Sequence, residues 1–386
     1  MILYAVGAMT VLLSSVIPTE SCRACSETCM CEFDPITMQC SDFHVDHLNP
    51  ELFENCTRVT KFLIINSTFM SLDNFLSAQF PYLKRVTLYN NVIRNVDRTN
   101  FENLTNLRSI IFERNNISYF DMQSFSNFSI LNQIILRNSS LKKIERGFFQ
   151  NNPSLSKLVL SQNEINNIEM GAFDNFVVLS RLSLDFNYLQ SLESGIFKNL
   201  SKVLEINLAY NRLEMLINGS FEGLIQLRTL NLSFNSLSVL SKDTFFELRN
   251  LEVLTLDYNK LEFLPVEAFS MQQELMTLDL TGNKIQTLDV QMLEPLTHLV
   301  RIQIKWNPLR CDCELRRVWD WCEGKTYKFL AICASPPEYA GRYLMALEKL
   351  ECSKETEETL VVFLCLSAVF VVVLISFFIY LHYNYV

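Results

Sequence analysis

The 386-residue chain has little of several residue types that enzymes and nucleic-acid-binding proteins need. It has 9 Gly, and no glycine-rich phosphate loop is present. It has four His, namely His44, His47, His298 and His382, so residues 48–297 cannot supply a histidine-based catalytic or metal site. No nucleophile elbow or acid–base pair occurs, and a net charge of −9 argues against a general nucleic-acid binder. We therefore expect no enzyme, no cofactor, no metal and no nucleic-acid partner.

Charged residues are also few, at 19 %, whereas apolar residues make up 49 % of the chain. This balance excludes disorder as a description of the whole chain. The 29 Phe against 3 Trp indicate that Phe fills one structural position again and again. The 12 Cys are many for a cytosolic protein and favour an oxidising compartment.

The start of the chain resembles a secretory leader. Residues 2–13 are almost wholly apolar, and small or polar residues follow to Ser21. The run is too short to span a bilayer comfortably, so we interpret residues 1–21 as a signal peptide, although no Lys or Arg precedes the apolar run. Cleavage after Ala24 is the alternative, and it would remove Cys22.

The end of the chain contains a long uncharged run. Residues 360–381 hold 22 residues without a charge, enough for a helix to cross a hydrocarbon core of about 30 Å. We predict an acidic stalk at 353–359, a single transmembrane helix at 360–381 and a short cytoplasmic tail at 382–386. A glycolipid-anchor signal is the alternative.

A 24-residue pattern fills most of the chain between these ends. In the stretch that begins at Leu251, Leu occupies positions 1, 4, 6, 11 and 14, Asn position 9 and Phe position 19. The pattern recurs without an insertion, which is the leucine-rich repeat signature over residues 59–306. The units start at Val59, Leu83, Leu107, Leu131, Leu155, Leu179, Val203, Leu227, Leu251 and Leu275, with a truncated unit at Leu299.

Each repeated position has a structural reason. Positions 4 and 6 are alternate residues of a short strand, so both point inward, and stacked units form one long parallel sheet. The amide at position 9 can satisfy the turning backbone of neighbouring units. Ser67 and Ser139 replace this Asn and should make a weaker ladder. Phe at position 19 should form a buried spine. The fold class is therefore an α/β solenoid, a horseshoe with a parallel concave sheet.

Cysteines flank the repeats on both sides. Four precede them, Cys25, Cys29, Cys31 and Cys40, and four follow, Cys311, Cys313, Cys333 and Cys352. Spacing alone leaves several connectivities open. The two sets resemble the N- and C-terminal caps of extracellular leucine-rich repeat proteins, a superfamily that includes Toll-like receptor ectodomains, variable lymphocyte receptors, Slit and insect adhesion receptors. The resemblance implies caps at residues 22–58 and 307–352, with the pairs Cys25–Cys31, Cys29–Cys40, Cys311–Cys333 and Cys313–Cys352.

Three further cysteines precede the uncharged run. We interpret Cys56 and Cys322 as buried thiols, because Cys56 falls at an apolar repeat position and Cys322 shares a helical face with Leu315 and Val318. Cys22 can bond Cys56, bond a second chain, or leave with the signal peptide.

The face of the predicted sheet that does not pack into the core divides into two halves. At position 5 the first five units, the early half, are mostly aliphatic, whereas the remaining units, the late half, are polar. Basic residues accompany the early half and acidic residues the late half. We therefore predict a binding site in the early half for an extracellular acidic protein or an anionic lipid or glycan. Its residues are Leu63, Arg85, Ile111, Arg114, Ile135, Arg137, Lys157 and Val159.

Two other surface features bear on this site. Phe186, Tyr210, Phe234 and Tyr258 form a row at position 8, which we interpret as structural because aromatic residues before the Asn are common in such repeats. Nine N-x-[ST] sequons predict glycosylation, and a glycan at Asn231 would push ligands toward the early half. The sequons are Asn55, Asn66, Asn103, Asn116, Asn127, Asn138, Asn199, Asn218 and Asn231.

These features predict a single-pass type I protein of the plasma membrane with its repeats outside the cell. We expect a recognition receptor or adhesion molecule in innate immune or cell–cell recognition, which signals through a co-receptor because no signalling domain follows the span. A dimer is compatible with the pattern. The alternatives are a structural, matrix-like anchored solenoid and a glycolipid-anchored decoy.

Overall fold

The computed structural model describes residues 22, 24, 29–33, 36–45, 48–72, 74–323 and 329–347. The predicted signal peptide, stalk, transmembrane helix and tail lie outside these residues. So do Asp46, His47, Cys25, Cys352 and His382. Within the part that is described, no helix is both long and apolar enough to cross a membrane.

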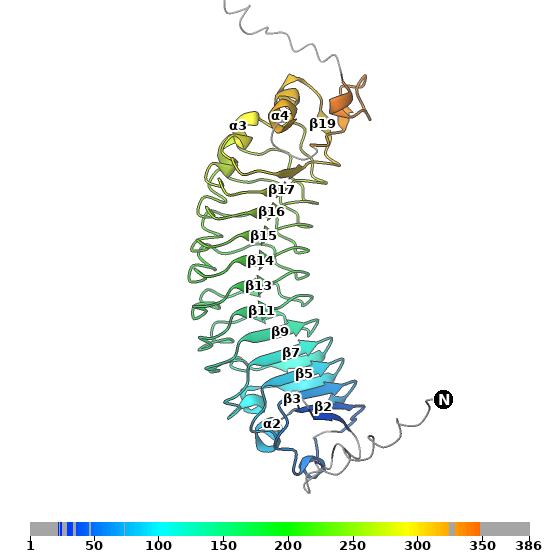
Figure 1. Cartoon of the computed structure of the whole chain (residues 1–386), viewed down its shortest axis with the longest axis vertical. Helices are drawn as coiled ribbons and strands as arrows, with labels where there is room; N and C mark the ends of the chain where they lie inside the picture. The colour runs from blue at the N-terminus through cyan, green and yellow to red at the C-terminus, as the bar shows by residue number, and fades with distance from the viewer. Residues whose placement is uncertain are drawn as a thin grey trace, which may run out of the picture.

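The described chain is an elongated, gently curved solenoid whose strands are stacked one above another (Figure 1). Its main sheet has thirteen strands in the order β1-β2-β3-β5-β7-β9-β11-β13-β14-β15-β16-β17-β18. An antiparallel hairpin of β1 and β2 begins the sheet, and every later neighbour is parallel. The strands are β1 (Cys29–Phe33), β2 (Ile36–Ser41), β3 (Lys61–Ile65), β5 (Arg85–Tyr89), β7 (Ser109–Glu113), β9 (Gln133–Arg137), β11 (Lys157–Val159), β13 (Arg181–Ser183), β14 (Glu205–Asn207), β15 (Thr229–Asn231), β16 (Val253–Thr255), β17 (Thr277–Asp279) and β18 (Arg301–Gln303).

The 24-residue register predicted from the sequence is confirmed. Lys61 pairs with Arg85, Arg85 with Ser109 and so on to Thr277 with Arg301, each step covering one unit. Position 5 therefore forms an unbroken row across the sheet, and β2 extends this row to Gln39. Positions 4 and 6 are buried, as the alternating burial of β3 and β5 illustrates.

Strands of the first four units are longer than the later strands of the main sheet. β3, β5, β7 and β9 are five residues long, and the main-sheet strands β11 and β13 to β18 are three residues long. The arrows of the early strands are accordingly longer (Figure 1). β-Branched and aromatic residues fill the longer strands, and these favour extended backbone. The early units also form a second sheet from β4 (Thr68–Phe69), β6 (Val92–Val96) and β8 (Asn116–Phe120), followed by the pair β10 (Lys143–Ile144) and β12 (Asn167–Ile168).

Asparagine at position 9 connects consecutive units, as predicted. Asn187 is 2 % exposed. Its Nδ2 donates to the carbonyls of Leu160 and Leu184, both at 2.9 Å, and its Oδ1 accepts from the Ile165 amide at 3.0 Å. Ser139 reaches the preceding unit less well, because its Oγ lies 3.4 Å from the Phe112 carbonyl. The ladder is weaker there, in agreement with the prediction.

Phenylalanine at position 19 forms the predicted spine. Phe173 and Phe197 stack with centroids 6.0 Å apart, and Phe245 and Phe269 repeat this geometry at 6.0 Å. All eight spine residues are buried, at 3 % exposure or less. Short helices cross the side opposite the main sheet. They are η1 (Pro50–Phe53), α2 (Phe75–Gln79), η2 (Arg98–Phe101), η3 (Val266–Phe269) and α3 (Val290–Leu293).

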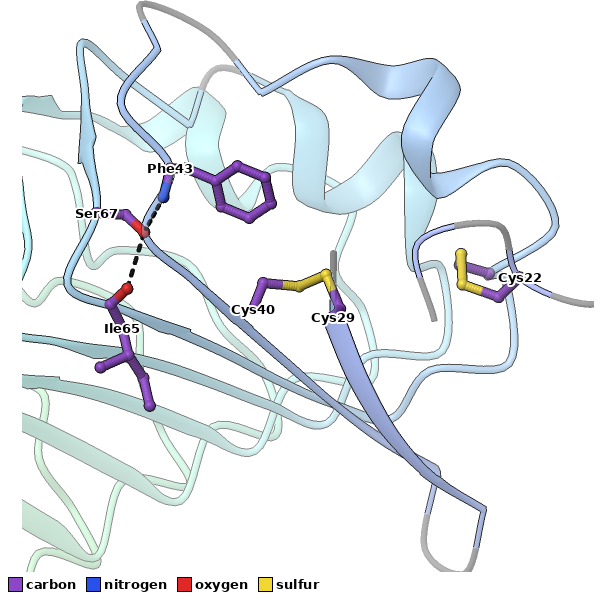
Figure 2. Close-up of a disulfide and its surroundings, with 7 residues drawn as sticks. Cys22, Cys29, Cys40, Phe43, Ile65 and Ser67 are labelled. Carbon is purple, nitrogen blue, oxygen red and sulfur yellow. Dashed lines mark hydrogen bonds between the residues drawn. A yellow bond between two sulfur atoms is a disulfide. The ribbon is translucent and has the colours of Figure 1, made fainter. Parts of the chain in front are cut away.

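The N-terminal cap contains the predicted Cys29–Cys40 disulfide, which joins β1 to β2 (Figure 2). A second disulfide joins Cys22 to Cys56, with Cα atoms 4.6 Å apart, so the interpretation of Cys56 as a buried thiol is wrong. The apolar repeat position that Cys56 occupies lies at the open end of the solenoid, where residue 22 also packs.

The cap is tied to the first unit through Ser67, one of the two replacements at position 9. The Phe43 amide donates to Ser67 Oγ at 3.0 Å, and this hydroxyl donates to the Ile65 carbonyl at 2.9 Å (Figure 2). A serine fits this position because the group on its other side is a cap rather than another full repeat.

The C-terminal cap contains the predicted Cys311–Cys333 disulfide. Its elements are β19 (Leu309–Arg310), α4 (Cys313–Glu323), β20 (Cys333–Ser335) and η4 (Leu344–Ala346). Cys322 is buried with Leu315 and Val318 on one face of α4, as expected. Cys31 and Cys313 are also disulfide-bonded, and the partners predicted for them, Cys25 and Cys352, lie outside the described residues.

Candidate binding surface

The early half of the concave face presents a partly apolar row. Leu63, Ile111 and Ile135 lie at position 5 of β3, β7 and β9, and each is partly exposed. Val159 continues the row on β11 but is only 4 % exposed. The prediction that Val159 adds apolar surface is therefore wrong, because Val159 packs in register between Ile135 and Ser183 with almost none of its surface in contact with solvent.

Basic side chains border this row. Arg85, Arg114 and Arg137 are exposed, and Lys157 is partly exposed. No carboxylate among the described residues forms an ion pair with Arg85 or Arg137. Arg114 instead donates from Nη1 to Tyr89 Oη at 2.9 Å. The predicted residues of the site thus lie together on one face, and the cations at Arg85 and Arg137 are available to a ligand.

The boundary between the two halves is an ion pair. Lys157, Arg181 and Glu205 are neighbours in register on β11, β13 and β14. Arg181 donates to Glu205 through Nε at 2.5 Å and Nη2 at 2.8 Å. Hydrogen bonding to the Arg181 guanidinium holds the pKa of Glu205 below its usual range. Burial opposes this shift, and the charges of Arg181 and Lys157 add to it.

The late half is acidic and aromatic. Asp257 is half-buried beneath it, and the Ser233 hydroxyl donates to its carboxylate. Burial raises the pKa of Asp257, and the neighbouring charge of Asp279 raises it further. Phe186, Tyr210, Phe234 and Tyr258 follow the strands in one continuous stack, which Trp306 extends. Trp306 was not predicted to join this row, although it lies 48 residues, or two repeat lengths, after Tyr258.

The predicted glycosylation sites are accessible. Eight of the nine sequon asparagines are exposed, and Asn231 is partly exposed on the concave face. Asn231 uses its Oδ1 to accept from the Ser233 amide at 3.0 Å and from Thr255 Oγ1 at 2.8 Å. No described bond occupies its Nδ2, the atom to which a glycan attaches.

Metal ligands do not converge on the surface that is described. No group of three His, Cys, Asp or Glu within this part of the chain could hold a metal ion. His44 is exposed at the N-terminal cap, and His298 lies 2.9 Å from the Gln273 carbonyl.

A leucine-rich repeat family model matches residues 81–137, 129–189, 177–237, 211–261, 225–271 and 249–309. The chain belongs to the leucine-rich repeat family. The family's repeats thus cover most of the main sheet, and the cysteine pairs at both ends fit a capped member of it. None of the curated proteins compared with the chain matches it.

Two solved structures share the fold. One is a chain of an octameric complex of Latrophilin 3, Unc5D and FLRT2 (LRR), with 22 % identity and a TM-score of 0.60, covering 79 % of this chain and 86 % of that chain. The other belongs to the Toll–Spatzle complex of Drosophila, with 19 % identity and a TM-score of 0.64, covering 81 % of this chain and 50 % of that chain. At these identities the likeness concerns the fold.

Proposed function

We propose that this protein is a cell-surface recognition receptor or adhesion molecule that binds an extracellular macromolecule through the early half of its concave face. The fold supports this proposal, since the two similar structures are assemblies of leucine-rich repeat proteins with other proteins. The Toll–Spatzle complex is a hub in development and innate immunity, and the octameric complex contains Latrophilin 3 and Unc5D beside FLRT2. Innate immune recognition and cell–cell adhesion are the two settings we propose.

One observation carries the proposed site. Leu63, Ile111 and Ile135 remain partly exposed in one row, and Arg85 and Arg137 beside them lack a described acidic partner. An apolar centre with a basic rim is complementary to an acidic protein surface that exposes an apolar element. We favour such a protein as ligand, with an anionic lipid or glycan conjugate as the alternative.

The arrangement of the chain follows from the same proposal. Residues 1–21 direct it to the secretory pathway, and residues 22–58, 59–306 and 307–352 form the capped ectodomain. Residues 353–359 connect this ectodomain to a span at 360–381, which leaves residues 382–386 in the cytoplasm. A signal would then pass through a co-receptor or a second copy. A glycolipid-anchored decoy with the same ectodomain is the second candidate, because an apolar C-terminal run also occurs in glycolipid signals.

A binding screen with the full-length chain displayed on cells tests the proposal. Extracellular proteins and anionic glycolipids serve as probes, and each hit is measured again with Ile135→Asp. This change places a charge in the contact and should abolish binding. Arg137→Glu should mainly slow association and change its salt dependence.

The matched control is Ile225→Asp, the same substitution at an Ile that is 53 % exposed and lies outside the concave strands. It should leave binding unchanged. Loss of binding with the control and retention with Ile135→Asp would place the site elsewhere. Absence of any saturable ligand would favour a structural, matrix-like solenoid.

A further inference from the structure

Four aromatic rings form a continuous stack along one edge of the late half. Phe186, Tyr210, Phe234 and Tyr258 have successive centroid distances of 4.1, 4.2 and 4.4 Å and interplanar angles of 7°, 7° and 17°. Trp306 lies at the end of the row, 5.9 Å from Tyr258. We call these five residues the aromatic ladder.

The turn at position 8 does not require aromatic residues. The ladder residues have φ between 52° and 56°, and Asn66, Asn90 and Asn138 occupy the same position in the early half with φ between 50° and 55°. Asparagine adopts this left-handed conformation more readily than a bulky residue does. The repeat geometry therefore accounts for the spacing between the rings, but it does not account for the presence of aromatic residues at position 8 of the late half.

The ladder also stays open to solvent. Phe186, Tyr210 and Tyr258 are 38–44 % exposed, and Trp306 is 67 % exposed. None of the nine sequons falls at position 8 of the late half, whereas Asn66 and Asn138 occupy that position in the early half. N-linked glycans at position 8 would thus cover the early edge and leave the ladder accessible.

Acidic side chains lie along the concave side of the ladder. Asp185 and Asp257 directly precede Phe186 and Tyr258 in the chain, and Asp279 lies on the next strand, β17. Hydroxyl groups hold two of these carboxylates, since Ser161 Oγ donates to Asp185 at 2.6 Å and Ser233 Oγ donates to Asp257. No Lys, Arg or His in the described chain forms an ion pair with any of the three.

Cations on the opposite side of the ladder are mostly engaged. The Arg212 guanidinium lies 4.2 Å from the centroid of the Tyr188 ring, and Lys284 pairs with Glu262 at 3.1 Å. Lys260 is the further cation at this edge. On the concave side, exposed Lys305 directly precedes Trp306, and no ion pair joins it to any of the three aspartates in the described chain.

We infer that the aromatic ladder and the aspartates beside it bind an extended, lysine- or arginine-bearing segment of a partner protein. Stacked rings cover each other's faces, so the ladder presents apolar ring edges against which the methylene stem of Lys or Arg can lie. The charged end then reaches Asp185, Asp257 or Asp279. Trp306 adds an exposed ring on which a guanidinium can stack. This surface is separate from the early-half site and does not depend on it.

The test uses the full-length chain after enzymatic removal of N-linked glycans, since Asn231 lies on the neighbouring strand β15. The probe is a peptide in which Lys and Leu alternate, and the comparison peptide has Glu in place of Lys. The first should bind and the second should not. Asp257→Asn should weaken binding about tenfold, because it removes the charge but keeps the size and the acceptor for Ser233. Phe234→Gln, which introduces the residue type that Gln162 places at this position in the early half, should weaken it similarly.

Two control variants show whether the loss of affinity is specific to this surface. Asp243→Asn removes an exposed carboxylate outside the concave strands and should leave the affinity unchanged. Ile135→Asp should also leave it unchanged, which distinguishes this surface from the early-half site. Thermal unfolding checks that each variant is folded. Unchanged affinity in Asp257→Asn, equal loss in Asp243→Asn, or binding of a neutral oligosaccharide in place of the Lys peptide would overturn the inference.

Discussion

Arg181 and Glu205 form a two-bonded ion pair between adjacent strands, at the point where the concave face changes from basic to acidic. The Nε–Oε2 distance is 2.5 Å and the Nη2–Oε1 distance is 2.8 Å. Lys157 precedes the pair in register, on the basic side. At this boundary between the basic and the acidic part of the concave face, Arg181 and Glu205 neutralise each other's charge. The pair thereby separates two surfaces that suit partners of opposite charge.

Replacement of Glu205 by Gln should make stability less dependent on pH in the acidic range. Because Arg181 holds the pKa of Glu205 below that of the unfolded chain, the pair stabilises the fold above the unfolded-state pKa. This stabilisation disappears as pH falls through the folded-state pKa. Both side chains are nearly half exposed, so Glu205→Gln should lower the free energy of unfolding by only about 0.5 kcal/mol at about pH 7.

Denaturant unfolding at neutral and strongly acidic pH measures this effect. The two curves should converge in acid, where Glu205 is protonated. Glu193→Gln, at an exposed carboxylate with no ion pair in the described chain, is the control and should show no such pH dependence. An undiminished difference in acid would mean that the substitution acts through packing.

Exchange of Asn and Ser at position 9 should shift stability in opposite directions at two places. Asn187→Ser removes bonds to two buried carbonyls and one amide, so it should cost about 1–3 kcal/mol. Ser139→Asn should stabilise by about 1 kcal/mol, since it can shorten the 3.4 Å contact to Phe112. Calorimetric unfolding of both variants checks the pair. A lower melting temperature for Ser139→Asn would show that the gap there is too small for an amide.

The Cys22–Cys56 disulfide predicts where the mature chain begins. The bond requires that Cys22 be retained, so cleavage should follow Ser21 and not Ala24. Peptide mapping of the secreted, non-reduced chain should recover a linked peptide that contains both cysteines. Removing the bond with Cys22→Ser and Cys56→Ser together should cost about 2–4 kcal/mol. A mature N-terminus at Cys25 would contradict this account of the cap.

Anchoring by a transmembrane helix can be separated from anchoring by a glycolipid. We predict that residues 360–381 cross the membrane once, with the repeats outside. Phosphatidylinositol-specific phospholipase added to intact cells should therefore leave the chain in place. A known glycolipid-anchored protein on the same cells is the positive control, and release of both proteins would establish the glycolipid alternative.

Much of the fold was predictable because a fixed 24-residue step repeats the same local physics. Along the repeats, Leu at positions 4 and 6 and Phe at position 19 are buried, and Asn at position 9 bonds the backbone of a neighbouring unit. A shift of the repeat by one residue would have placed all of these side chains wrongly, so the pattern allows only one register. Strand length was less predictable, because it depends on how each unit's β-branched residues meet their neighbours.

The candidate site was only partly predictable. The exposure of Ile135 follows from its strand position, but the 4 % exposure of Val159 depends on side chains contributed by other strands. The Cys22–Cys56 bond likewise depends on how residue 22 packs against the end of the solenoid. The stacking of the rings in the aromatic ladder depends on the left-handed backbone conformation at Phe186 and the equivalent residues, which the sequence did not reveal.

Side-chain footprinting of the ligand complex tests the central claim most directly. Hydroxyl radicals would label the full-length chain alone and when saturated with the protein ligand recovered by the binding screen. The account predicts that Tyr89, Ile111 and Ile135 lose most of their labelling in the complex, while Ile225 keeps it. Unchanged labelling of Tyr89, Ile111 and Ile135 at saturation would contradict the claim that the early half of the concave face is the recognition site.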